Sequence, residues 1–573
     1  MVDLAKITQP LSLARLGQRS RGPVVLELDL TEGVADEAPG DPIAQLVNRR
    51  KQHHLELVEG IRRGARDPRV AALLVRVDTR TLGFAKVQEL RDCVADFRAA
   101  GKTAVAWADS FGESGEGNLS HYLACAFDRI AMAPTGVLGL TGLKLKGTFV
   151  KGALDKLGVG YEVGRRHEYK SALNGVTETG FTDAHREVSE SIVSSLGDQL
   201  VEAVAQARGL SEERVRELVS QGPFMAGEAV EHGLVDRLAY RDEIYADLLA
   251  EVRGERGREP ELLFVTRYHR RHTPTQLPLP GSGASCIALI SATGTISTGR
   301  TRRSPLGGGT VMGSDTVCAA FRAARRDPDV KAVVFRVDSR GGSPTASDAI
   351  RREAELTSRA GKPVVAVMGD VAGSGGYYVT LGADAIVAQP GTLTGSIGVI
   401  TGKPVLGPLL ERYGVTSDAV STGPHAGMFD LERPFSESEW ERVNALLDEV
   451  YGDFTAKVAR ARSMTPEQVH EVARGRVWTG REAHERGLVD ALGGLETAVR
   501  IARDKAGAGA LPLRSFPRRG ALDGLRAHES SEDLAASGPQ SSLSAWGPLE
   551  GAALALGLPL GGPLSMPGAW EVR

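Results

Sequence analysis

One serine and one lysine in this sequence have the residue types and surroundings for nucleophilic chemistry. Ser374 stands in "GDVAGSGGYY", where Gly373 and Gly375 leave the side chain uncrowded and free a backbone amide to face a substrate oxygen. Lys170 stands in "RRHEYKSALNG". A lysine accepts a proton as a general base only when it is neutral, so Lys170 would have to be desolvated to activate a serine.

A pair of glycines indicates where the charge of a reaction intermediate could be stabilised. Gly341 and Gly342 follow a predicted buried strand in "DSRGGS", whereas the matching stretch earlier in the chain reads "DTRTLG". Adjacent glycines let backbone amides turn into a cleft, and one such amide contributes about 3 kcal/mol of transition-state stabilisation. The later stretch is therefore the one that favours an oxyanion.

The chain that must position these residues contains a repeat. Residues 67–107 match 327–367 without a gap at an offset of 260, and residues 121–142 match 377–398 at an offset of 256. Each copy reads as a buried strand, a loop, an amphipathic helix and a Gly-Lys turn into another strand. This pattern predicts an α/β fold with largely parallel sheets, present twice.

The repeat and the composition divide the chain into five parts. At 573 residues the chain exceeds what one hydrophobic core usually serves. A Pro-, Gly- and Arg-rich stretch separates the copies, and the Ser-, Gly- and Pro-rich sequence after the second copy is typical of disorder. We predict an N-terminal extension at 1–20, a first domain at 21–252, a connector at 253–285, a second domain at 286–510 and a flexible tail at 511–573.

Comparison of the two copies singles out positions that keep reactive chemistry in one copy only. By the downstream offset Ser374 corresponds to Asn118, which cannot be a nucleophile of this kind, whereas the upstream offset leads to Ser114. Lys170 corresponds to Ala426. A lysine kept in the first copy and a serine kept in the second favour one composite site built from both copies, within one chain or between two chains.

The motifs "GSGGYY" and "TLTGSIGV" in the second copy, with "YKSA" in the first, resemble the signal peptide peptidase A (protease IV) family of the long tandem-repeat type. The resemblance covers roughly residues 20–510. It implies two tandem domains of the ClpP/crotonase-like fold, hydrolysis of peptides such as cleaved signal peptides or unfolded segments, and a homo-oligomer, in this family a tetramer. The sequence departs from the family pattern where Arg340 replaces a proline, where His167 replaces a glycine and where "NGV" (174–176) replaces an acidic-Pro-Phe stretch, and we see no counterpart of the N-terminal membrane anchor of the long bacterial form.

The same resemblance assigns roles to individual residues. It implies that Ser374 is the nucleophile, that Lys170 is the general base and that Ser396, in "TGSIG", orients the lysine amine. The implied oxyanion donors are the backbone amides of Gly375 and of Gly342 or Gly341. The mechanism requires neither a metal ion nor an organic cofactor.

Composition and charge exclude several other classes of protein. The 69 Lys and Arg against 72 Asp and Glu give a net charge of -3, which provides no electrostatic basis for nucleic-acid binding. The 4 cysteines lack metal-ligand spacing.

The first residues lack an apolar run for a signal peptide or membrane anchor, so we expect a cytoplasmic protein or one peripheral at the inner face of the bacterial membrane. The apolar, Gly- and Pro-rich stretch 543–570 could contact a membrane or a partner.

Three alternatives stay open at this point. His425, beside Ala426, could replace Lys170 as the base for Ser374. A crotonase-like enzyme could use the glycine amides on an acyl-CoA thioester without a serine nucleophile. A non-catalytic ring could scaffold membrane proteins.

Overall fold

The computed structural model describes most of the two predicted domains and short parts of the predicted tail. The described residues are 22–35, 52–113, 115–253, 257–272, 285–303, 310–517, 530, 535, 540–541, 564–566 and 571–572. The predicted N-terminal extension and Ser114 lie outside these residues.

The first domain is built on a six-stranded parallel sheet in the order β11-β6-β5-β4-β1-β12. Apolar runs such as "VAALLVR" form its central strands, because a parallel sheet is covered by helices on both faces. Its strands are β1 (Val24–Asp29), β4 (Val70–Arg76), β5 (Thr103–Ala108), β6 (Arg129–Met132), β11 (Arg237–Leu238) and β12 (Glu261–Phe264).

The second domain repeats the same strand order. β24-β20-β19-β17-β13-β25 are joined by parallel pairs, in the sequence positions that correspond to β11-β6-β5-β4-β1-β12. The prediction of two tandem α/β domains with strand-helix repeats is therefore confirmed. Its strands are β13 (Cys286–Thr293), β17 (Val330–Ser339), β19 (Val364–Gly373), β20 (Ala385–Ala388), β24 (Ala491–Leu492) and β25 (Leu513–Ser515), and β21 (Leu393–Gly395) and β23 (Val477–Thr479) continue the sheet beyond the end of β19.

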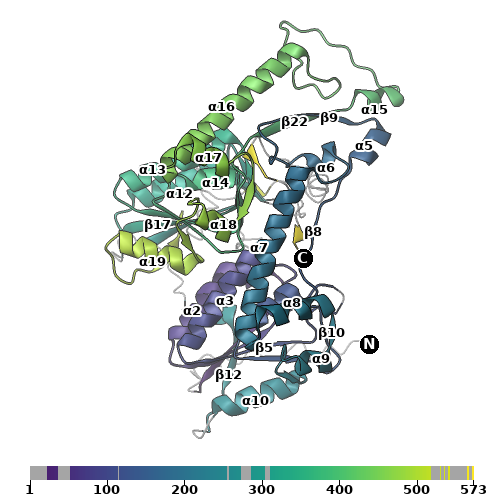
Figure 1. Ribbon diagram of the computed structural model, residues 1–573. Coiled ribbons are helices and arrows are strands. Elements are labelled where there is room, and N and C mark those ends of the chain that lie inside the picture. The colour runs from purple at the N-terminus through teal and green to yellow at the C-terminus, as the bar shows by residue number, and fades with distance from the viewer. Residues whose placement is uncertain are drawn as a thin grey trace, which may run out of the picture.

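Helices flank both sheets, and one long helix from each copy reaches away from its domain (Figure 1). α7 begins after Thr182, whose side chain accepts from the His185 amide, and α16 begins at a Ser436–Glu439 capping box. The helices that matter below are α2 (His54–Arg66), α3 (Phe84–Ala99), α4 (Asn118–Ala124), α7 (Asp183–Arg208), α13 (Pro344–Arg359), α14 (Gly375–Thr380), α16 (Glu437–Arg462) and α19 (Leu495–Lys505).

The two domains share a buried polar contact. Glu89 on α3 accepts from Arg336 on β17 at 2.9 and 3.2 Å and from the Leu495 amide of α19 at 2.8 Å, and its carboxylate also lies 2.7 Å from the His54 ring. Burial alone would raise the pKa of Glu89, but the charges of Arg336 and the contact with His54 hold it well below its usual range. Nearby, Lys86 bridges Asp338 and Asp370 of the second domain at 3.0 and 3.1 Å.

Parts of the predicted connector and tail join the sheets. Within 253–285, β12 and α11 (Val265–His272) pack on the first domain, with β12 pairing with β1. Within 511–573, β25 extends the second sheet, and three further short strands are described: β26 (Gln540–Ser541), β27 (Leu564–Ser565) and β28 (Glu571–Val572). Among the helices in the described part of the chain, none is long and apolar enough to cross a membrane.

Candidate active site

Ser374 lies at the sharp junction between a strand and a helix of the second domain. β19 ends at Gly373 and α14 begins at Gly375, and the serine between them has φ 54 and ψ -115. A positive φ is costly for a residue with a Cβ, and strained backbone of this kind occurs where a side chain must be presented to a ligand. The Ser374 amide donates to the Gly395 carbonyl at 2.8 Å, which fixes the turn against β21.

An antiparallel ribbon brings the first copy to this serine. β9 (Gly160–Arg165) pairs with β22 (Ile400–Val405), with Arg165 opposite Ile400 (Figure 1). Lys170 follows β9 by five residues, and Ser396 precedes β22 by four. The ribbon therefore places "YKSA" of the first copy beside "TGSIG" of the second, and the two halves of the site meet within one chain.

The Lys170 amine reaches three oxygen atoms. Its Nζ lies 2.7 Å from Ser374 Oγ, 2.8 Å from the Ser396 carbonyl oxygen and 3.0 Å from Ser396 Oγ. All three side chains have an exposed fraction of 0%. Burial lowers the pKa of Lys170 well below its ordinary value, because the ammonium form loses its hydration.

Two backbone segments of the second domain hold the lysine in place. Ser396 has φ 50, and its amide donates to the Arg476 carbonyl at 2.7 Å. Gly475 has φ +83, and a Cβ there would lie 2.6 Å from the Lys170 backbone nitrogen. Gly475 was not predicted from the sequence, and the signal available there was "ARGRVW", in which the glycine stands two residues before β23.

The three glycines predicted to form the oxyanion hole converge beside Ser374. A Cβ on Gly375 would lie 3.1 Å from the Gly342 nitrogen and 3.1 Å from the Gly341 Cα. The Gly341 amide donates to Ser339 Oγ at 3.1 Å, so it already has a partner. Ser339 was also missed, because an ordinary serine at a strand end carries no signal of its own.

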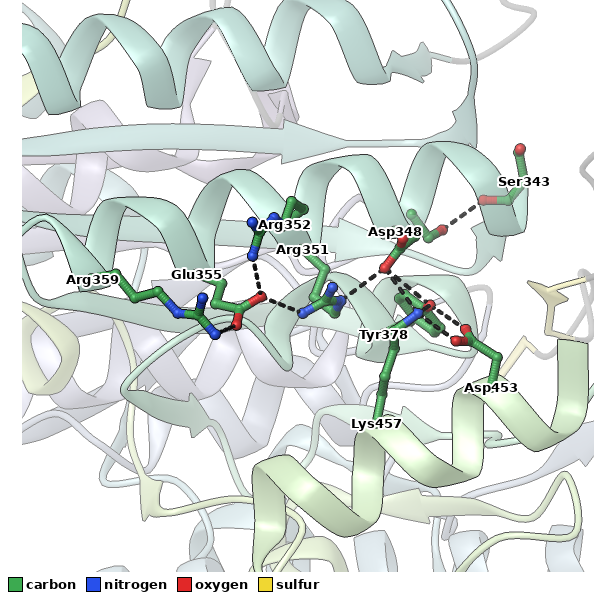
Figure 2. A network of polar contacts seen from close by, with 10 residues as sticks. Ser343, Asp348, Arg351, Arg352, Glu355, Arg359, Tyr378, Asp453 and Lys457 are labelled. Atoms are coloured by element: carbon green, nitrogen blue, oxygen red, sulfur yellow. Dashed lines mark hydrogen bonds and ion pairs between the residues drawn. The ribbon is translucent and has the colours of Figure 1, made fainter.

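A network of polar contacts holds α14 against its neighbours (Figure 2). Tyr378, one turn after Ser374, donates to Asp453 of α16 at 2.6 Å and accepts from Lys457 at 2.7 Å. Lys457 also lies 3.0 Å from Asp348 on α13, the helix that follows the glycine pair. The helices that follow the nucleophile and the glycine pair are thus braced by one another and by α16.

The position of the first copy that corresponds to Ser374 has a structural role. The Asn118 side chain accepts from the amides of Thr141 and Gly142, both at 3.0 Å, and is buried.

His425 lies in an exposed loop where its Nε2 is 3.2 Å from Ser438 Oγ, while Lys170 occupies the position next to Ser374. In the residues that the structure describes, no group of three His, Cys, Asp or Glu is arranged to hold a metal ion.

The residue that replaces the family's glycine has the conformation of a glycine. His167 has φ 66, the left-handed region that costs other residues roughly 1–2 kcal/mol. Its ring packs on Tyr451, with centroids 4.9 Å apart, and on His470 at 5.3 Å. These ring contacts offset part of the cost of the backbone conformation.

Comparison with known proteins adds to this geometry. A model of the family described as Peptidase family S49 matches residues 96–253 and 357–509, one segment in each copy. The chloroplastic serine protease SPPA of Arabidopsis thaliana is 34% identical over 452 residues, covering 79% of this chain and 65% of that protein. Protease 4 of Salmonella typhi is 33% identical over 462 residues, covering 79% of this chain and 72% of that protein.

The solved structures give a partial likeness. A ClpP1 mutant from Listeria monocytogenes covers 37% of this chain and 94% of its own, at 14% identity and a TM-score of 0.24.

Proposed function

Because the chain belongs to peptidase family S49 and is a serine peptidase, we propose that it is an endopeptidase with Ser374 as nucleophile and Lys170 as general base. The contact that carries this proposal is the 2.7 Å separation of Lys170 Nζ and Ser374 Oγ, both fully buried. Burial favours the neutral amine, which is the form that accepts a proton.

The three contacts of the Lys170 amine match the hydrogen-bonding groups of a neutral lysine. A neutral amine has two N–H groups and one lone pair, and Lys170 Nζ has three oxygen neighbours. Two N–H groups directed at the carbonyl and hydroxyl of Ser396 leave the lone pair for the Ser374 hydroxyl proton. Ser396 is the orienting residue in this arrangement.

The reaction proceeds through an acyl-enzyme. As Ser374 Oγ attacks the peptide carbonyl, Lys170 takes its proton, and the tetrahedral oxyanion accepts from the amides of Gly375 and Gly342. Lys170 then protonates the leaving amine, and water hydrolyses the ester by the same route. The Gly341 amide, which donates to Ser339, shapes the turn that presents Gly342.

The proposed substrates are peptides such as cleaved signal peptides or unfolded segments, and the proposed assembly is a homo-oligomer, in the family a tetramer. Exposed apolar side chains after the β9–β22 ribbon support a subunit contact there: Tyr413 is 75% exposed and Phe429 is 76% exposed. We place the protein in the cytoplasm or at the inner face of the membrane. Sedimentation of the Phe429→Asp variant against wild type tests the subunit contact.

The deciding experiment compares peptide hydrolysis by wild type, Ser374→Ala, Lys170→Met and the control His425→Ala. We expect the first two variants to lose activity by at least about a thousandfold and the control to keep it. A serine-directed phosphonate should label wild type at Ser374. Near-full activity of Lys170→Met would refute the dyad, and an unlabelled Ser374 in a protein that binds CoA esters would favour the acyl-CoA alternative.

A further inference from the structure

A segment from the predicted tail lies as an added strand on the glycine pair of the active site. β27 runs antiparallel to β18 (Gly341–Gly342), with Ser565 opposite Gly341 and Leu564 opposite Gly342. The Met566 amide donates to the Arg340 carbonyl at 2.8 Å. The pairing adds one strand at the edge of a sheet in the order β26-β15-β16-β14-β18, in which β14 is Thr295–Ser297, β15 is Arg302–Arg303 and β16 is Thr310–Gly313. This is the way in which an extended peptide adds to an exposed strand.

The side chains of this segment are buried. Leu564 has an exposed fraction of 0% and Met566 of 3%. Met566 contacts an apolar cluster that includes Val477 of the second domain and a stripe on α7 of the first domain, formed by Val188, Ile192 and Leu196. A Cβ on Gly373, the residue before Ser374, would lie 2.2 Å from Met566 Sδ. The Met566 side chain therefore fills an apolar pocket directly beside the nucleophile.

The backbone of the segment lies beside the proposed oxyanion donors. A Cβ on Gly341 would lie 2.0 Å from the Leu564 carbonyl oxygen and 2.7 Å from the Gly375 nitrogen. The Leu564 carbonyl oxygen and the Gly375 amide nitrogen therefore both lie next to Gly341. A substrate strand that placed its own carbonyl at Gly375 would have to displace Leu564.

Two further pairings hold the chain on either side of the segment. β26 pairs with β15 (Arg302–Arg303) of the second domain, and β28 pairs with β8 (Leu145–Lys146) of the first. The segment is therefore pinned across the boundary between the domains and is presented to the cleft at high effective concentration.

On the premise of the proposed peptidase function, we propose that Leu564–Met566 is an intramolecular, substrate-like inhibitor that must leave β18 before a peptide can bind. The cleft selects its occupant by backbone pairing and by one apolar pocket that suits a flexible side chain such as Met or Leu. Peptides with such a residue are the substrate class that competes best with the segment.

The test uses full-length point variants at one position. Met566→Asp places a charge in the apolar pocket, Met566→Pro removes the amide that donates to Arg340, and Met566→Leu is the matched control. We expect phosphonate labelling of Ser374 to be about tenfold faster or more in the Asp and Pro variants, because the fraction of open clefts rises, and unchanged in the Leu variant. Equal labelling rates in all four proteins would overturn the inhibitor.

Hydrogen exchange of the peptide that spans Gly341 and Gly342 tests the contact without any chemistry. Faster exchange in Met566→Asp than in Met566→Leu is expected, and equal exchange would overturn the strand pairing. If no variant labels at Ser374 but exchange responds as expected, the peptidase proposal fails while the strand contact stands. The two proposals are thereby judged separately.

Discussion

Replacement of Lys170 by methionine should change the pH dependence of stability in a calculable way. The native amine has an exposed fraction of 0% and a pKa that burial lowers, whereas the unfolded chain holds a lysine with a pKa of about 10.4. Between these two pKa values the unfolded chain binds one more proton than the native protein. The free energy of unfolding of wild type therefore rises with pH relative to Lys170→Met.

The slope follows from linkage alone. One proton corresponds to about 1.4 kcal/mol per pH unit, so the free energy of unfolding of wild type should rise by about 1.4 kcal/mol relative to the variant for each pH unit between the native pKa of Lys170 and about 10.4. The variant also loses the hydrogen bonds of the amine. This loss changes the difference in free energy of unfolding between the two proteins by the same amount at every pH, so the slope of that difference against pH is unchanged. Below the native pKa of Lys170 the amine is charged in both states, so the slope falls to zero there.

The assay is urea unfolding of both proteins over this pH range, followed by tryptophan fluorescence, since Trp478 is 5% exposed and borders the site. Lys331→Met, at an exposed lysine of the second domain, is the matched control. A pH-independent difference for Lys170→Met would mean that the native lysine is charged, and the general-base assignment would be refuted.

Three further changes test the parts around the dyad. Ser396→Gly keeps the positive φ but removes the hydroxyl 3.0 Å from Lys170 Nζ, so kcat should fall about tenfold with KM unchanged; an unchanged kcat would remove Ser396 from the mechanism. Ser339→Ala removes the acceptor of the Gly341 amide and should lower kcat about tenfold without changing substrate affinity, which steady-state kinetics measures against Ser343→Ala. Glu89→Gln leaves the buried Arg336 without its carboxylate and should destabilise the protein by about 3–5 kcal/mol near neutral pH in urea unfolding. Because the native pKa of Glu89 is lowered, its contribution is present above the ordinary carboxyl pKa of about 4.3 and is lost as the pH falls, so the Gln variant should approach wild type in acid.

The sequence was sufficient to predict the two domains because parallel strands buried on both faces leave long apolar runs. Runs such as "VAALLVR" and "VKAVVFRVDS" became the central strands β4 and β17 of equivalent sheets. The comparison of the two copies led to Ser374 and Lys170, and Lys170 Nζ lies 2.7 Å from Ser374 Oγ. It could not decide whether they meet within one chain, because that depends on the pairing of β9 with β22, and neither strand reveals its partner.

The residues that shape the site through their backbone were harder to predict. Ser374, Ser396 and His167 all have positive φ, yet none is a glycine, so composition gave no sign of these turns. Ser339 and Gly475 act through single contacts with Gly341 and Lys170 that exist only in the folded protein. Such contacts join residues far apart in sequence and leave no periodicity to read.

The segment Leu564–Met566 was also hard to predict from the sequence, because its conformation depends on contacts with a distant part of the chain. Its Gly- and Pro-rich surroundings predicted a flexible tail, because a strand that has no hydrophobic partner strand of its own cannot form alone. An edge such as β18 supplies the missing backbone partners, and the Met566 pocket supplies the burial. An exposed strand edge can hold a flexible segment in an extended conformation, so the strand at Leu564–Ser565 depends on its pairing with β18 more than on the tail sequence.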